Sequence, residues 1–427
     1  MQSHVLFLTL NVFSATGGIE KVSRLAGKAL HELCSEEGGS LQVFSMYDGK
    51  SEDCGAYFPA TAFRGFEGRR MAFVVRSLQE GRKADLVILS HVNLLSVGYA
   101  IKRLSPATRL VLLAHGIEVW QPFPAWKRHM LQGCDSILPV SRFTRDKMKQ
   151  LYGLENSKLR VVNNCLDPQL PPPAGRRSAR LVDKYGLLPG SKVVLTLTRL
   201  SHKDWYKGYD DVLMAMKSLK KEHPGLRYML IGTCDSVEKA RLNRLICQQG
   251  LEEVVIFTGY VPDNELAEHF SVADCYIMPS RKEGFGIVFV EALYYGLPVI
   301  AGCIDGSVDA LAGGSMGVLV DPDDPVEIRA ALKRVLGRGV SNQPSTADVL
   351  ARFGYPVYKQ ALWQAIRPFL QTEKRSTGKK GLQKKPTPMT MLCEEISMIQ
   401  HCSGKTCKLT HSRRLARALR CSCLPKE

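Results

Sequence analysis

Short apolar runs alternate along this chain with longer segments in which apolar residues recur every three or four positions. Each short run is rich in Val, Ile or Leu and is bounded by Gly, Asn, Ser or Pro, a pattern that predicts a buried strand. The longer segments have helical periodicity, so the chain is predicted to be built from parallel β-α-β units. The predicted strands form two series: residues 5–10, 41–46, 86–90, 110–114, 137–140 and 161–162, and then residues 193–198, 228–231, 254–258, 275–278, 298–301 and 318–320.

A proline-rich segment separates the two series of strands. Residues 167–175 contain three consecutive prolines, which fit neither a helix interior nor a central strand, so this segment is interpreted as a linker. We therefore predict an N-terminal domain over residues 1–170 and a second domain over residues 171–354. In doubly wound α/β domains of this kind, ligands bind at the carboxyl ends of the strands, so the site is expected in a cleft between the domains.

The last part of the chain changes character twice. Residues 355–372 have aromatic and aliphatic side chains at helical spacing, which predicts a last helix that can cross back to the N-terminal domain. Residues 373–427 lose this periodicity and carry thirteen Lys and Arg against four Asp and Glu, so we expect a disordered basic tail. Zinc binding by this tail is disfavoured because the spacing of its candidate ligands matches no strong pattern; they are Cys402, Cys407, His411, Cys421 and Cys423.

Composition places the chain among globular proteins and leaves several partners open. Of the 427 residues, 45% are hydrophobic and 23% are charged. No apolar run approaches the roughly 20 residues that cross a bilayer, and the opening residues lack the features of a signal peptide. We expect a cytoplasmic protein, with a place at the inner membrane surface left open. The net charge of +17 suits a phosphate-bearing substrate, but no nucleic-acid-binding module is present, so a nucleic-acid partner is not predicted.

The strongest chemical signal follows the predicted strand 275–278, where a glycine loop leads into a helix. Glycines let the backbone approach a ligand closely, and the first amides of a helix attract a diphosphate. Glu283 and Glu291 flank this turn, and their carboxylates can accept hydrogen bonds from hydroxyl groups. The alternative is that Glu283 caps the helix and Glu291 lies on its solvated face. The backbone predicted to hold the diphosphate is that of Gly284, Phe285, Gly286, Ile287 and Val288.

The segment from Glu283 to Ala301 resembles the E-(x)7-E signature of glycosyltransferase family 4, and the resemblance extends over roughly residues 3–370. It implies the GT-B fold, which is two Rossmann-like doubly wound domains facing each other across a cleft. It also implies a retaining, metal-independent transferase that needs no cofactor beyond its nucleotide-sugar substrate. The acceptor would be a glycan or lipid-linked molecule, as in surface polysaccharide synthesis. In this family the first glutamate orients the donor sugar and the second binds the ribose, which assigns those roles to Glu283 and Glu291.

Other segments agree with this resemblance. Gly17 and Gly18 resemble the family's glycine loop, which closes over the donor, and His115 resembles its histidine that contacts the transferred sugar. Arg199 and Lys207 resemble the cations that hold the donor pyrophosphate; such cations would neutralise the leaving group as the glycosidic bond breaks. Two alternatives remain: His115 could be a structural histidine, and Lys207 could be a solvated lysine on a loop.

Further residues are predicted to line the site. Gly232 and Val261 follow predicted strands and are expected beside the nucleotide base. Trp120, Phe123 and Trp126 either stack on sugar rings or form core beneath a loop, and the sequence leaves both open.

An acidic motif at Asp321, Asp323 and Asp324 is interpreted as a turn and a helix cap rather than a metal site.

Three rival functions stay open at this point. The chain could be a non-catalytic sugar-nucleotide-binding regulatory subunit, or another enzyme of the same architecture, such as a sugar-nucleotide epimerase or a phosphorylase. The third is a nucleic-acid binder, which rests on the net charge alone. Separately, arginines alternate with aromatic residues over residues 63–76, a pattern that could lie on a membrane surface, although an ordinary solvated helix face is the preferred interpretation.

Overall fold

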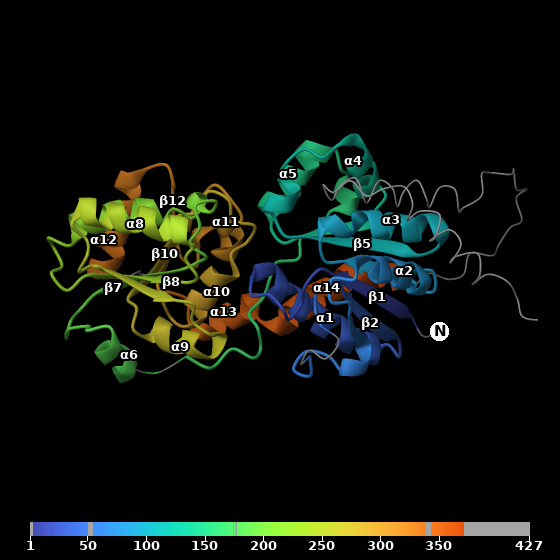
Figure 1. The fold of residues 1–427 in the computed structure, drawn as a ribbon, viewed down its shortest axis with the longest axis horizontal. Coiled ribbons are helices and arrows are strands. Elements are labelled where there is room, and N and C mark those ends of the chain that lie inside the picture. Colours follow the sequence, from blue (N-terminus) through green and yellow to red (C-terminus); the bar gives the residue numbers. More distant parts are fainter. Residues whose placement is uncertain (1–2, 50–53, 174, 176, 339–342, 371–427) are drawn as a thin grey trace, which may run out of the picture.

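The computed structural model describes residues 3–49, 54–173, 175, 177–338 and 343–370. It contains two parallel β-sheets of six strands each, and each sheet is covered by helices (Figure 1). The two halves lie side by side along the long axis, with the N-terminal half coloured blue to teal and the C-terminal half green to orange. The domain boundaries themselves stay a prediction, and the predicted basic tail lies outside the described residues.

The first sheet has the strand order β3-β2-β1-β4-β5-β6, and all of its neighbouring strands are parallel. This is the order of a doubly wound sheet, with a reversal between β1 and β4. Its strands are β1 (His4–Thr9), β2 (Ser40–Ser45), β3 (Phe63–Gly65), β4 (Leu86–Leu89), β5 (Arg109–Ala114) and β6 (Ser136–Pro139). The helices of this half are α1 (Gly18–Glu36), α2 (Arg70–Gly81), α3 (Leu95–Leu104), α4 (Ala125–Gln132) and α5 (Arg142–Tyr152), with short 3-10 turns η1 (Ala60–Ala62), η2 (Val92–Leu94), η3 (Ile117–Val119) and η4 (Asn156–Lys158).

The second sheet has the strand order β12-β11-β10-β7-β8-β9. Starting from β9, this is the same order as in the first sheet. Its strands are β7 (Val193–Leu197), β8 (Arg227–Ile231), β9 (Val255–Gly259), β10 (Cys275–Met278), β11 (Val299–Gly302) and β12 (Val318–Val320). The helices that follow the first half are α6 (Ala179–Lys184), α7 (Tyr209–Leu219), α8 (Ser236–Gln249), α9 (Asp263–Ser271), α10 (Ile287–Tyr294), α11 (Ser307–Ala310), α12 (Pro325–Arg338), α13 (Thr346–Phe353) and α14 (Tyr355–Leu370), with the 3-10 turns η5 (Trp205–Lys207) and η6 (Ala312–Gly314).

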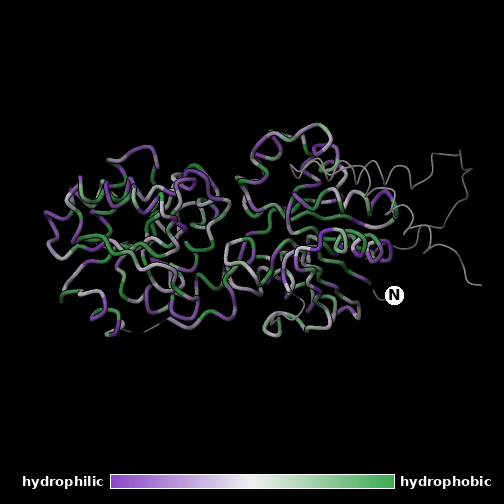
Figure 2. Tube along the Cα trace, in the orientation of Figure 1, coloured by the Kyte–Doolittle hydropathy of each residue, from purple (hydrophilic) through white to green (hydrophobic). Residues whose placement is uncertain are grey.

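The inner strands of both sheets are buried on both faces, which explains why they are continuous apolar runs rather than alternating ones. In the central strand β1, residues 5–8 are each 0% exposed. Figure 2 shows the same pattern as hydrophobic segments that follow the strands, with hydrophilic stretches on the outer helices and loops. Parallel sheets covered on both faces leave only the ends of the strands for polar chemistry.

The last helix, α14, returns to the first half of the molecule and lies beside α1 (Figure 1). Its buried residues share one hydrophobic cluster with Leu30 and Leu33 of α1; they are Tyr358, Leu362, Ala365 and Ile366. At its surface, Lys359 pairs with Glu32 at 2.9 Å. Where the chain crosses back, the Leu166 amide donates a hydrogen bond to the Phe353 carbonyl oxygen at 2.9 Å, so the two connecting segments contact each other.

Eleven of the twelve predicted strands are observed, with ends that differ by one residue at most. The strand predicted at residues 161–162 is wrong: this segment forms no strand, although the Val162 amide bonds to the Pro139 carbonyl oxygen beside β6. The sixth strand of the first sheet is instead β3 (Phe63–Gly65), which is three residues long with Arg64 exposed at its centre. Such a segment is too short to carry a periodic signal.

The burial of two aromatic residues contradicts the interpretation of residues 63–76 as a membrane-binding surface. Phe66 packs edge to face against Phe44 and Phe73, with ring centroids 5.4 Å apart in both pairs. Phe66 and Phe73 are only 4% and 0% exposed, so neither ring can contact a lipid surface in this fold. Among the described helices, none is long and apolar enough to cross a membrane.

The packing of α14 predicts the effect of one substitution. Leu362→Ala should lower the stability of the first half by about 2–5 kcal/mol, since it removes a fully buried side chain from the shared cluster. Thermal unfolding followed by circular dichroism measures this effect. Gln364→Ala, at an exposed position of the same helix, is the matched control. Equal melting temperatures for the two variants would contradict a stabilising contact of α14 with this half.

Candidate functional site

The predicted site residues follow the carboxyl ends of strands in both halves. Gly17 and Gly18 lie at the start of α1, after β1, and His115 directly follows β5. In the second half, Arg199 lies two residues beyond β7, and Glu283 lies in the loop after β10. Because the carboxyl ends of parallel strands share one edge of a sheet, each half gathers its candidate residues along one edge.

Two glycines bring these edges together. A β-carbon placed on Gly116 would lie 2.6 Å from the Gly284 α-carbon, and one placed on Gly284 would overlap the carbonyl oxygen of His115. Gly116 also has a φ of 142°, a conformation that side-chain-bearing residues rarely adopt. The loop after β5 and the loop after β10 therefore touch through bare backbone, which makes His115 and Glu283 neighbours from different halves.

Ion pairs cross the same boundary. The Arg142 Nε lies 2.9 Å from Asp309 Oδ1, and the Arg142 amide donates to the other oxygen of this carboxylate at 3.0 Å. Lys21, in the first turn of α1, donates to Glu291 Oε1 at 2.9 Å. Burial opposes protonation of Lys21, but the carboxylates of Glu291 and Asp263 raise its pKa above the ordinary value, so it is charged near neutral pH.

Both glutamates of the predicted signature pair with a lysine. Glu291 is 3% exposed on α10 and binds Lys21, as described above. Glu283 binds Lys207 through its Oε2 atom, and both of these side chains are largely shielded from solvent. The structure thus brings Glu283 and Lys207 into contact, as the sequence analysis expected of residues around one ligand. Lys21, which the sequence analysis left without a role of its own, joins them.

Arg199 is oriented by an acidic partner. Its Nε donates to Asp204 Oδ2 at 2.7 Å, and the other oxygen of Asp204 accepts from the Tyr206 hydroxyl at 2.8 Å. Although burial opposes it, these two hydrogen bonds hold the pKa of Asp204 below its usual value. The Arg199 side chain remains 72% exposed, so its guanidinium retains donors for an anionic ligand.

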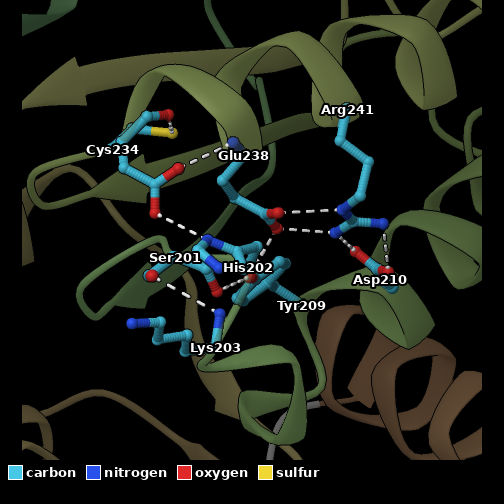
Figure 3. Close-up of polar contacts among 9 residues, drawn as sticks. Ser201, His202, Lys203, Tyr209, Asp210, Cys234, Glu238 and Arg241 are labelled. Carbon is cyan, nitrogen blue, oxygen red and sulfur yellow. Dashed lines mark hydrogen bonds and ion pairs between the residues drawn. The ribbon is translucent and has the colours of Figure 1, made fainter.

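The loop between Arg199 and Lys207 is anchored at Ser201 by a polar network around the buried Glu238 (Figure 3). The Tyr209 hydroxyl lies 3.2 Å from the Ser201 carbonyl oxygen and 2.6 Å from Glu238 Oε1. Arg241 joins the network by binding Glu238 at 2.6 Å and Asp210 at 2.7 and 2.8 Å. Glu238 is 0% exposed, and its partnered charge fixes the base of the loop that carries both predicted phosphate-binding cations.

The glycine loop after β10 leads into α10 as predicted. Gly286 is the N-cap of this helix, with φ of 81°, and Ile287 is its first residue. Phe285 is 2% exposed and packs against Phe353 with ring centroids 5.9 Å apart. This buried ring anchors the loop while the first amides of α10 lack partners within the helix, as at any helix start.

His115 presents one ring nitrogen without a partner. Its Nε2 lies 2.6 Å from the Ser90 carbonyl oxygen, which can only accept, so Nε2 carries the proton. Its Nδ1 is buried and has no hydrogen-bond partner within the part of the chain that the structure describes. Next to it, burial lowers the pKa of His91 to about 4, so His91 is neutral near pH 7. His91 directly follows Ser90 at the same strand edge, and the sequence analysis missed it.

The remaining predicted residues have mixed outcomes. Phe123 stacks on Tyr152 at 4.8 Å, and Trp120 packs on Phe143 at 5.1 Å, which favours the core interpretation for both aromatic residues. Trp126 is 40% exposed. Gly232 and Val261 follow β8 and β9, and their contact with a base stays a prediction.

The acidic motif behaves as a turn and a cap. Asp324 accepts from the amides of Val326 and Glu327 at 2.8 and 3.2 Å, and Asp323 binds Arg281 at 2.7 Å. Within the described residues, no group of three His, Cys, Asp or Glu could hold a metal ion.

Two family models match the chain in succession. Residues 16–170 match the model described as Glycosyltransferase Family 4, and residues 179–346 match the model described as Glycosyl transferases group 1. The first match covers the half that carries His115, and the second covers Arg199, Lys207, Glu283 and Glu291.

Curated relatives match over parts of their length. A GDP-mannose-dependent alpha-(1-6)-phosphatidylinositol monomannoside mannosyltransferase of Mycolicibacterium smegmatis is 31% identical over 248 residues, 55% of this chain and 63% of that protein. A D-inositol 3-phosphate glycosyltransferase of Acidothermus cellulolyticus is 32% identical over 201 residues, 45% of this chain and 44% of that protein. The chain thus spans between 44% and 63% of the length of these relatives.

Solved structures share the fold at low sequence identity. The crystal structure of Anabaena Alr3699/HepE in complex with UDP superposes with a TM-score of 0.72 and 20% identity, covering 86% of this chain and all of that chain. This likeness, with the two parallel sheets, identifies the architecture as GT-B.

The glycine contact between the two halves predicts one further substitution effect. Gly284→Ala should lower the melting temperature by several degrees, because its methyl group would overlap the His115 carbonyl oxygen and force the loops apart. Gly337→Ala, in α12 with open space around the new methyl group, is the control and should be neutral or stabilising. Unchanged melting of the Gly284→Ala protein would contradict the close approach of the two loops.

Proposed function

Because the chain belongs to glycosyltransferase family 4, we propose that it transfers a sugar from a nucleotide-sugar donor to an acceptor hydroxyl, with retention of configuration. The observation that carries this proposal is the pairing of both signature glutamates with lysines where the two halves meet. Each pair thus sets a carboxylate suited to sugar hydroxyls beside a cation suited to phosphates. A nucleoside diphosphate sugar presents both kinds of group.

The donor diphosphate is proposed to bind Arg199, Lys207 and the first amides of α10, from Phe285 to Val288. Arg199 offers an exposed guanidinium, and Lys207 can exchange its contact with Glu283 for a phosphate oxygen. The start of α10 adds its partial positive charge. Gly17 and Gly18, at the start of α1, bring a second helix N-terminus from the other half.

The nucleoside and the sugar are proposed to bind the two glutamates. Glu291 accepts hydrogen bonds from the ribose hydroxyls after Lys21 gives up its present contact. Gly232 and Val261 flank the base. Glu283 orients the transferred sugar, and His115 accepts a hydrogen bond from a sugar hydroxyl at its unprotonated Nδ1, because its Nε2 is committed to Ser90.

In the proposed reaction, the bond between the anomeric carbon and the donor phosphate oxygen breaks first, leaving a cation-like sugar. The acceptor hydroxyl attacks from the same face, forms the new glycosidic bond and gives its proton to the departing phosphate oxygen. Arg199 and Lys207 stabilise the negative charge that develops on the leaving diphosphate. The chain's own cations take the part that a metal ion plays elsewhere.

The acceptor is proposed to be a glycan or lipid-linked molecule, and the protein is proposed to act on the cytoplasmic side. With a lipid-linked acceptor, the protein would associate peripherally with the membrane that holds this acceptor. Buried free thiols at Cys34, Cys134, Cys165 and Cys275 suit a reducing compartment. A regulatory subunit would bind nucleotide sugars without turnover, and an epimerase would convert the donor without an acceptor. Product analysis with and without a panel of acceptors separates these outcomes.

Removal of each glutamate should have a different effect. Glu291→Ala should raise the donor Kd roughly 10- to 100-fold, about 1.4–2.7 kcal/mol, because it deletes the acceptor of the ribose hydroxyls. Glu283→Ala should abolish turnover, because it deletes the group that orients the transferred sugar. Calorimetry with a panel of nucleotide sugars and release of nucleoside diphosphate measure the two effects.

The matched control for both variants is Glu222→Ala. Glu222 forms a surface ion pair with Lys333 at 2.8 Å, and removing such a pair has little effect on stability. Full turnover of Glu283→Ala, or an unchanged donor Kd for Glu291→Ala, would contradict the roles proposed for these residues.

Metal removal provides an independent test of the proposed mechanism. Excess EDTA should leave kcat within about twofold of its value, since Arg199 and Lys207 rather than a metal ion stabilise the leaving group. Turnover that is lost in EDTA and restored by Mg²⁺ or Mn²⁺ would overturn this part of the mechanism.

A further inference from the structure

A second loop packs against the loop that carries Glu283. It follows β11 and includes Asp305 and Gly306, and it holds both backbone polar groups of Glu283. The Glu283 amide donates to Asp305 Oδ2 at 2.7 Å, and the Glu283 carbonyl oxygen accepts from the Gly306 amide at 2.7 Å. The other oxygen of Asp305 accepts from the Ser307 amide at 2.9 Å. The backbone position of Glu283 is thus set by the loop after β11.

The two loops are also in steric contact. A β-carbon on Gly306 would overlap the Gly284 carbonyl oxygen and would lie 2.6 Å from the carbonyl oxygen of Glu283. Little space therefore remains for either backbone to shift independently of the other. A change in the hydrogen bonds of Asp305 would be passed directly to Glu283.

Burial of the Asp305 carboxylate is unfavourable for the free energy of folding. Asp305 is 1% exposed, and within the described chain no Lys or Arg forms an ion pair with it. A buried carboxylate without a cationic partner is costly, so a purely structural role would be served equally well by a neutral side chain. The site that it supports gives a reason for the charge.

We propose that Asp305 is a positioning residue: its ionised carboxylate accepts from the Glu283 amide and, within its own loop, from the Ser307 amide, and so holds Glu283 in the orientation needed for sugar transfer. This inference rests on the proposed function. The ionised carboxylate can accept from both amides, whereas the protonated acid places a hydrogen on one oxygen and loses an acceptor there. Turnover should therefore follow the ionisation of Asp305.

Burial raises the pKa of Asp305 to about 7; the hydrogen bonds from Ser307 and Glu283 lower it, and the Glu283 carboxylate raises it further. Turnover should fall as the pH drops below about 7. Since the folded-state pKa is above the ordinary value, the folded protein holds this proton more tightly, and Asp305 lowers stability as the pH rises toward 7. The charged or titratable groups that face the two loops are Glu283 with Lys207, Asp309 with Arg142, and His115.

The test compares the full chain with Asp305→Asn and Asp305→Ser, and uses Asp324→Asn as the control. Asp324 also accepts from two backbone amides but lies exposed at the start of α12. For both Asp305 variants, kcat should fall at least tenfold at pH 8, the donor Kd should change less than threefold, and the decline of turnover below pH 7 should disappear. The melting temperature of Asp305→Asn at pH 8 should equal or exceed that of the unsubstituted protein, a result that a structural carboxylate would not give.

Three results would overturn the inference. They are an unchanged kcat in both Asp305 variants, an acid decline that persists in them, or, if neither variant folds, an unsubstituted protein whose kcat does not fall between pH 8 and pH 6. A protein that neither binds nor turns over any nucleotide sugar would instead defeat the proposed function, and the inference with it. Donor binding by the unsubstituted protein, measured first, distinguishes the two failures.

Discussion

The site depends on one contact, the approach of two backbones where Gly116 faces Gly284. No side chain separates the loops, so residues that follow strands of two different sheets become immediate neighbours. The ion pairs of Lys21 with Glu291 and of Arg142 with Asp309 lie around this contact and span the same boundary. The fold thus builds a single chemical environment from two halves that could not form it alone.

Charged side chains of this environment are paired with side chains of opposite charge, with Asp305 as the exception. Each signature glutamate already has an ammonium partner, and Arg199 has Asp204. Buried charges without partners are strongly unfavourable, so this pairing lets acids and bases lie close together. Ligand binding then becomes an exchange of partners, in which hydroxyl groups and phosphates replace side chains of opposite charge. Such an exchange favours a ligand that carries both kinds of group over one that carries either alone.

The sequence predicted the strands well because fully buried parallel strands are continuous apolar runs, and β10 and β12 have the predicted ends. It failed at residues 161–162 and at β3, where two or three residues carry no periodic information.

The site residues could be named from their positions after strands, but not their partners. Lys207 and Glu283 are 76 positions apart, and Lys21 and Glu291 are 270 apart, distances over which spacing gives no guidance. Asp305 also follows a strand, but its hydrogen bond with the Glu283 amide arises only when the loops after β10 and β11 come together in the fold.

The return of α14 to the first half means that the chain crosses the boundary twice, and the crossings are joined by the hydrogen bond from Leu166 to Phe353. Two adjacent tethers restrain relative motion more than one does. Rotation of the halves about the line of the paired segments would strain these two connections least, whereas sliding or twisting would stretch one connection against the other.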